Sequence, residues 1–246
     1  MKVTILTACY NCAPWIKQSI KSVLSQDYKN WEWIIVNDKS SDSSLKVIRK
    51  HTKKHDNIKV INNKSRLKCG GSYALALEHA TGDICCVLDA DDILVNSNAL
   101  STLVQLYEKY TEVAYIWTQF KFCDSNMKVL KNGSCQLPDT SLLQAGLDYS
   151  KYRHSFSHWR TFRTELRELG EIFKKGLPAA VDKWMGYALE ELGIGGFYPK
   201  TLYLYRQRVG GLSFKGRKHW SKMLKTFEKK RREENVEAYP TIRLSL

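Results

Sequence analysis

Val87-Leu88-Asp89-Ala90-Asp91-Asp92 places three carboxylates within four residues, directly after the apolar run 84–88. The run predicts a short buried strand, and a strand cannot bury that much like charge, so the acids must lie at its C-terminal end. In an open α/β sheet this end binds ligands. In extended backbone Asp89 and Asp91 point to the same side, where two oxygen ligands suit Mg²⁺ or Mn²⁺. A solvated strand-to-helix turn is the alternative.

Strand and helix patterns alternate through the first ninety residues. Strands are expected at residues 3–8, 31–36, 58–61 and 84–88, and amphipathic helices lie between them at about 16–25, 45–50 and 72–80. This order predicts a parallel, doubly wound sheet with right-handed crossovers. Lys68-Cys69-Gly70-Gly71-Ser72 is expected to be a glycine turn that opens the third helix. It matches neither a dinucleotide fingerprint nor a P-loop.

The regular alternation of strand and helix patterns ends after the three acids. A helix is expected at 99–110, short strands at 113–118, 120–123 and 127–130, a charged helix containing Glu165, Glu168 and Glu171, a helix at 181–192 and a strand at 198–205. We expect one domain over residues 1–213, divided at residue 110, followed by a basic amphipathic helix over 214–246. In this tail Trp220, Met223, Leu224 and Phe227 recur at helical spacing among basic residues.

Composition narrows the classes of partner and compartment. The 246-residue chain has a formal net charge of +14, which calls for an acidic partner such as a nucleotide, nucleic acid, anionic lipid or acidic polymer. No specific nucleic-acid-binding signature is present. The seven cysteines form no regular framework, which is typical of a reducing compartment. With neither a signal peptide nor a run of membrane-span length, a cytoplasmic protein is expected.

The order of motifs resembles a family 2 glycosyltransferase with the GT-A fold. The resemblance rests on five stretches, namely 3–11, 22–26, 33–42, Gly82-Asp83 and 88–92. It covers residues 1–110 and extends more weakly to residue 213. It implies a Rossmann-like sheet with a smaller acceptor-side subregion, a sugar-nucleotide donor that is usually UDP-linked, Mn²⁺ or Mg²⁺ as cofactor, and inversion at the anomeric carbon.

The resemblance also assigns residues to the donor. Asp91 would bind the metal, Asp89 would lie near the ribose and sugar, and Asp38 would hold the uracil base, although Asn37-Asp38 and Lys39 depart from the usual turn. The other residues assigned to the donor are Thr7, Ala8, Tyr10, Asn11, Lys68, Ala90, Arg206 and Arg208. The last two belong to a Tyr-Arg-x-His pattern in which Arg208 replaces the histidine; an arginine suits phosphate but not a metal.

The general base and the acceptor site are sought downstream. The base must face away from the departing diphosphate, so it cannot be an acid that already holds the metal. Asp182 fits because it lies at a predicted helix start; helix capping is its alternative role. His154 and His158 are candidates for binding acceptor or metal, or for packing. Trp159 and Trp184 could stack on a sugar or belong to the core.

The predicted function is sugar transfer to an acceptor hydroxyl of a saccharide or lipid-linked molecule, in the synthesis of cell-surface polysaccharide or glycoconjugate. The alternatives are a nucleotidyltransferase, which also places paired acids around a metal, and a non-catalytic module that binds sugar nucleotides or nucleic acid. The tail is expected either to contact the inner face of an anionic membrane or to pack on its own domain or on a second subunit of a homo-oligomer.

Overall fold

The computed structural model describes residues 1–137, 156–208, 229, 233 and 239–246. The strands are β1 (Val3–Cys9), β2 (Trp31–Asn37), β3 (Ile58–Asn62), β4 (Ile84–Val87), β5 (Ile93–Leu94), β6 (Tyr115–Cys123), β7 (Val129–Asn132), β8 (Arg160–Arg163), β9 (Gly195–Arg206) and β10 (Thr241–Arg243). The helices are α1 (Ile16–Leu24), α2 (Ser44–Thr52), α3 (Lys68–Glu78), α4 (Ala99–Lys109), the 3₁₀ helix η2 (Thr164–Glu168) and α6 (Val181–Glu190).

The strands form one mostly parallel sheet, as predicted. Its order is β10-β9-β6-β8-β4-β1-β2-β3, with β5 paired to β9 and β7 paired to β6. The β8 strand runs antiparallel to its neighbours β4 and β6, whereas β1 is parallel to both β2 and β4. β4 therefore lies in the interior of the sheet, and its C-terminal end opens at the edge where such sheets bind ligands.

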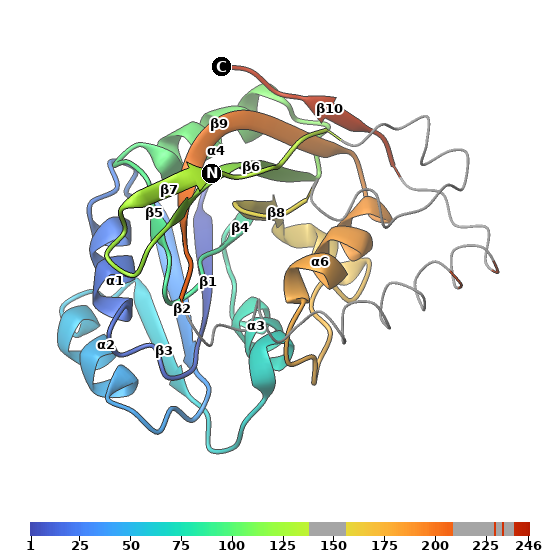
Figure 1. The fold of residues 1–246 in the computed structure, drawn as a ribbon. Coiled ribbons are helices and arrows are strands. Elements are labelled where there is room, and N and C mark those ends of the chain that lie inside the picture. The colour runs from blue at the N-terminus through green and yellow to red at the C-terminus, as the bar shows by residue number, and fades with distance from the viewer. Residues whose placement is uncertain (138–155, 209–228, 230–232, 234–238) are drawn as a thin grey trace.

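The local patterns of the first half explain its layers. The apolar runs of β1, β2 and β4 are almost wholly buried, as expected for strands covered on both faces. Ile16, Ile20 and Val23 form the buried stripe of α1. Helices α1 and α2 lie on one side of strands β1 to β3, and α3 lies on the other side (Figure 1).

The predicted glycine turn is wrong, because α3 begins at Lys68 and contains both glycines. The reason is a close backbone approach. A Cβ atom at Gly70 would lie 2.1 Å from the carbonyl oxygen of Lys174, and the Gly70 amide donates to the carbonyl of Leu177 at 2.9 Å. Glycine here lets a distant segment pack onto the helix instead of turning the chain.

The two strands predicted at 113–118 and 120–123 are one strand, β6. Its pairing with β9 shifts register on both sides of Gln119, so a β-bulge interrupts the alternation of apolar residues. The Gln119 side chain accepts from the amide of Phe120 at 3.1 Å and donates to the carbonyl of Cys135 at 3.0 Å. The predicted charged helix is wrong as well, because η2 ends at Glu168, before Glu171.

The chain returns to the sheet after the segment 209–238. β10 pairs with the beginning of β9, and Leu244 is 1% exposed. The predicted helix over 214–246 is therefore wrong for residues 241–243, and the domain boundary at 213 excludes a strand of the same sheet. Trp220, Met223, Leu224 and Phe227 lie outside the described residues. Among the helices that are described, none has the length and apolar character needed to cross a membrane.

Candidate active site

The turn after β4 gives its three acids different environments. The side chains of Asp89 and Asp91 are 27% and 20% exposed, whereas Asp92 is 1% exposed. The Asp92 amide closes the turn by donating to the Asp89 carbonyl at 3.0 Å. Two acids thus face the open edge of the sheet, and the third points into the protein.

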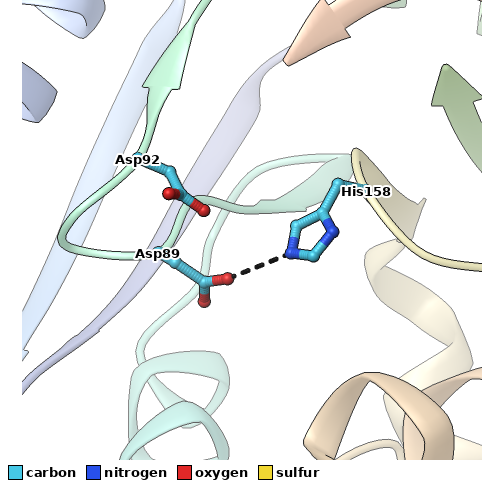
Figure 2. A group of neighbouring side chains, drawn as sticks. All are labelled: Asp89, Asp92 and His158. Atoms are coloured by element: carbon cyan, nitrogen blue, oxygen red, sulfur yellow. Dashed lines mark ion pairs between the residues drawn. The ribbon is translucent and has the colours of Figure 1, made fainter. Parts of the chain in front are cut away.

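Asp89 is held by three side chains from outside the acid turn. Arg160 Nη2 of β8 lies 2.9 Å from Oδ2, His158 Nε2 lies 3.4 Å from the same oxygen (Figure 2), and the Tyr73 hydroxyl of α3 donates to Oδ1. Burial acts to raise the pKa of Asp89, but Arg160 and His158 outweigh it and lower the pKa below its ordinary value. Asp89 is therefore an ionised carboxylate in a fixed orientation.

Asp92 ties β9 to the acid turn. Its Oδ2 accepts from the Tyr203 hydroxyl at 2.8 Å, and its Oδ1 accepts from the backbone amide of Arg206 at 2.7 Å. Burial, followed by the charges of Asp91 and Asp89, raises the pKa of Asp92 well above its ordinary value. Both oxygens are engaged within the protein, which gives Asp92 a structural role.

The Arg206 side chain is also committed internally. It is 2% exposed, and it donates to the carbonyls of Asp91 and Ser125 and to the side-chain oxygen of Gln18. These bonds hold the end of β9 against the acid turn and α1. Three of the five N–H groups of Arg206 are thereby engaged within the protein, and its predicted contact with the donor stays a prediction.

Asp91 faces the open edge with a cation beside it. Arg208 Nε lies 2.5 Å from Asp91 Oδ2, and the guanidinium carbon lies 4.5 Å from the centroid of the Trp15 ring. Burial raises the pKa of Asp91; Arg208 lowers it and Asp89 raises it further, with a net upward shift. A partly buried carboxylate of this kind favours a bound cation.

The predicted base contact, Asp38, is already saturated. Its carboxylate accepts from Asn63 Nδ2, Arg66 Nε and the backbone amides of Leu67 and Lys68 at 2.7–3.1 Å, which accounts for the acceptor sites of a carboxylate. Asp38 therefore positions the loop between β3 and α3. Two exposed groups beside it are the Tyr10 ring and Arg66, whose guanidinium carbon lies 3.3 Å from the ring centroid.

The other predicted donor residues lie in different environments. Thr7 is buried, donating to the Leu88 carbonyl at 2.7 Å and accepting from Trp33 Nε1 at 2.9 Å, so a place in the pocket lining is wrong for its side chain. Asn11 accepts from the Ser41 amide at 2.9 Å and, with φ of 52°, shapes the turn after β1. The remaining predicted positions are the partly buried Ala8, the buried Ala90 and the exposed Lys68.

A match to a protein-family model shows which family this chain belongs to. Residues 4–170, more than half of the chain, match the model of glycosyl transferase family 2. The chain belongs to this family. It is 29% identical over 219 residues to an uncharacterized glycosyltransferase of Haemophilus influenzae, covering 83% of this chain and 65% of that protein. It is 31% identical to the Escherichia coli glucosyltransferase WfgD, covering 52% and 49%.

Solved structures of other glycosyltransferases have the same fold. Staphylococcus aureus TarS in complex with UDP-GlcNAc superposes with a TM-score of 0.69 at 19% identity, covering 86% of this chain and 60% of that one. The mannosyltransferase PcManGT of Pyrobaculum calidifontis in complex with GDP-Man and Mn²⁺ gives 0.64 at 18% identity, covering 91% and 64%. The GT-A fold is thereby confirmed. This chain spans less than two thirds of the length of the curated relatives that it matches.

The family implies a divalent metal, and two sets of ligands are candidates. Asp89, Asp92 and His158 offer atoms within 4.8 Å of one another. An ion there would have to displace the bonds to Asp92 and the ion pair of Asp89 with Arg160, whose side chain is only 4% exposed, so this set fits poorly. Asp91 fits better, because Mg²⁺ and Mn²⁺ are commonly held by one or two carboxylates together with substrate phosphates and water.

The aromatic residues predicted to bind acceptor lie in unlike places. Trp159 is fully buried, so its predicted stacking on a sugar is wrong. His158 is buried against the rings of Tyr203 and Tyr205, with centroid distances of 5.0 and 4.6 Å; burial, together with Arg160, lowers its pKa. Trp184 is partly exposed, and its Nε1 donates to the Glu171 carbonyl at 2.8 Å. His154 lies outside the described residues.

The predicted base, Asp182, lies in the first turn of α6. The charge of Asp182 acts on Arg160 of the acid cluster. Burial acts to lower the pKa of Arg160, but Asp89, followed by Tyr73 and Asp182, raises it above its ordinary value. Asp182 is only partly buried, so its carboxylate can meet a substrate.

Sequence reasoning missed Arg160, Tyr73, Tyr203 and Arg66. Tyr73 and Tyr203 lie in elements that were predicted, but their hydroxyls reach Asp89 and Asp92 only through the packing of α3 and β9. Arg160 lies in β8, which has four residues and no apolar alternation to reveal it. The sequence holds no local signal that pairs these residues with acids 16 to 111 positions away.

The internal role of Arg206 predicts a stability effect. We expect Arg206→Met to lower the free energy of unfolding by about 2 kcal/mol, because it removes the hydrogen bonds that the buried Arg206 guanidinium donates to the acid turn, to Ser125 and to Gln18. Arg49→Met, on the exposed face of α2, is the control and should change stability by less than about 0.5 kcal/mol. Urea unfolding followed by tryptophan fluorescence measures both. Equal stabilities of the two variants would contradict the structural role of Arg206.

Proposed function

We propose that this chain transfers a hexose from a UDP-sugar to an acceptor hydroxyl, with inversion, in the synthesis of a bacterial cell-surface polysaccharide. The observation that carries the proposal is the pair of partly exposed, cation-paired acids, Asp89 and Asp91, at the end of β4 in a family 2 chain. The WfgD enzyme is named as a UDP-Glc:alpha-D-GlcNAc-diphosphoundecaprenol glucosyltransferase, and TarS was solved with UDP-GlcNAc.

The proposed donor site runs from the end of β1 to the acid turn. The nucleobase would pack against the Tyr10–Arg66 pair, in which the guanidinium carbon lies 3.3 Å from the ring centroid, and Asp38 would keep Arg66 in place through its bond at 3.0 Å. The fixed carboxylate of Asp89 would accept hydrogen bonds from the hydroxyls of the ribose or the sugar. These contacts align the anomeric carbon with the acceptor, which is a large part of catalysis in group transfer.

The leaving diphosphate needs its growing negative charge stabilised. A divalent ion held by Asp91 and by diphosphate oxygens would act as a Lewis acid. Arg208 lies beside Asp91, so its guanidinium would reach the diphosphate and add hydrogen bonds that suit phosphate geometry.

The acceptor hydroxyl would lose its proton to Asp182. Inversion by a single displacement requires the base on the face opposite the diphosphate, and Asp182 comes from α6 and not from the acid turn. Trp184 lies two residues after Asp182 in the same helix. It is partly exposed and would offer an apolar surface to the acceptor.

The acceptor is proposed to be a saccharide on a lipid-diphosphate carrier. WfgD and a Campylobacter jejuni glucosyltransferase, 34% identical over 105 residues, carry diphosphoundecaprenol or PP-undecaprenol acceptors in their names. The basic residues of the 214–238 segment would hold the chain at an anionic membrane surface, which would bring the site to such an acceptor.

A donor screen tests the proposal. With Mn²⁺ present, we expect UDP and a UDP-hexose to raise the melting temperature more than GDP or an NAD control, because ligands that bind the native state stabilise it. Incubation with that UDP-hexose and a lipid-linked saccharide should release UDP and extend the saccharide by one sugar. Release of hexose 1-phosphate, with UMP joined to the acceptor, would instead indicate nucleotidyl transfer, and no product in any pairing would contradict a glycosyltransferase.

A further inference from the structure

Two arginines at the end of β9 are bound in very different ways. Arg206 is fixed by hydrogen bonds to the acid turn, to Ser125 and to Gln18. Within the described residues, the contacts of Arg208 are a charge and a ring, namely the Asp91 carboxylate at 2.5 Å and the face of Trp15 at 4.5 Å. Its side chain is 23% exposed. Arg206 therefore serves the fold, and Arg208 is positioned to exchange partners.

The charges of the acid cluster balance without a metal. Asp89 pairs with Arg160, Asp91 pairs with Arg208, and Asp92 accepts from the backbone of Arg206, whose guanidinium lies against the acid turn. A divalent ion entering alone would add positive charge to a balanced cluster at a carboxylate that is already paired. A nucleoside diphosphate brings negative charge that compensates the charge of the ion. It also offers Arg208 a new anionic partner.

The geometry points to direct competition between Arg208 and the divalent cation for Asp91. Arg208 is the resident cation of Asp91 in the free protein. When the donor binds, the guanidinium moves from the carboxylate to the diphosphate, the ion takes its place, and Trp15 supports the arginine through the exchange by cation–π contact. Metal binding is thereby coupled to nucleotide binding, which limits capture of free ions. This inference rests on the proposed metal site at Asp91.

The coupling is measurable as Mn²⁺ affinity, without turnover. We expect the wild-type chain to bind Mn²⁺ weakly alone and at least about tenfold more tightly with UDP, as judged from the free Mn²⁺ signal in electron paramagnetic resonance. Arg208→Gln removes the competing cation, so Mn²⁺ alone should bind at least about tenfold more tightly than to wild type, and the gain produced by UDP should shrink. Arg208→Lys, which keeps the charge, should stay near wild type.

Two controls make the result specific. Arg49→Gln removes the same charge from the exposed face of α2 and should leave Mn²⁺ affinity unchanged. Adding Asp91→Asn to Arg208→Gln should abolish the gained Mn²⁺ binding if the ion lies at Asp91. If wild type and Arg208→Gln bound Mn²⁺ equally well without nucleotide, and UDP still strengthened binding to both, the proposed competition would be wrong. The proposed metal site at Asp91 would then remain. No Mn²⁺ binding to any variant, with or without UDP, would overturn both.

Discussion

Asp182→Asn is expected to bind the donor normally and to transfer sugar roughly a hundredfold or more slowly, the usual scale for loss of a general base. The amide keeps the size of the side chain but cannot accept the acceptor proton. Asp182 lies in the first turn of α6, apart from the turn that would hold metal and diphosphate, so the nucleotide site should remain intact. Donor affinity from calorimetry and initial rates with a saccharide acceptor measure the two effects separately.

A matched change on the same helix separates the chemistry from the fold. Glu191→Gln makes an equivalent substitution at the C-terminal end of α6 and should keep near wild-type rates. If Asp182→Asn bound the donor and also transferred at the wild-type rate, the base would have to be another group. Loss of donor binding in this variant would instead place Asp182 in the nucleotide site.

Asp91→Ala should reduce transfer by about a thousandfold or more, because the variant loses the ligand through which a metal would contribute several kcal/mol of charge stabilisation. Arg208 would lose its carboxylate partner, but its charge alone offers neither a divalent ion nor the same geometry to the diphosphate. The loss should appear in kcat as well as in donor affinity, because the interaction strengthens as the diphosphate departs.

The controls for this prediction address the metal. Asp56→Ala, in an exposed turn before β3, should behave as wild type. Excess EDTA should reduce the wild-type rate to that of Asp91→Ala, and Mn²⁺ should restore only the wild-type chain. Undiminished wild-type turnover in EDTA would show that the reaction proceeds without a divalent ion and that the cations of the cluster suffice.

The first half of the fold was predictable because its signals are local. Strands β1, β2 and β4 are continuous apolar runs, and α1 has a clear buried stripe. Such periodicity depends only on neighbouring residues and on burial. The position of the acids at the end of β4 follows from the cost of burying charge.

The second half was less predictable because its elements depend on distant partners. β8 and β10 are short, and they are stable only because existing strands supply their hydrogen-bond partners. The sequence predicts two strands on either side of Gln119, because a bulge and a turn both interrupt alternation. It predicts a turn at Gly70, because only the distant segment around Lys174 shows why a Cβ is excluded there.

The α/β order, the acid turn and the family resemblance follow from composition and from spacing along the chain. The role of each charged residue depends instead on its neighbours in the folded protein. Asp91 stays at the open edge while Asp92 is buried, and Arg208 remains exchangeable while Arg206 is fixed, because β9 crosses the acid turn more than a hundred residues later. Charge pairing depends on distance in space and on desolvation, and neither quantity is written in the local sequence.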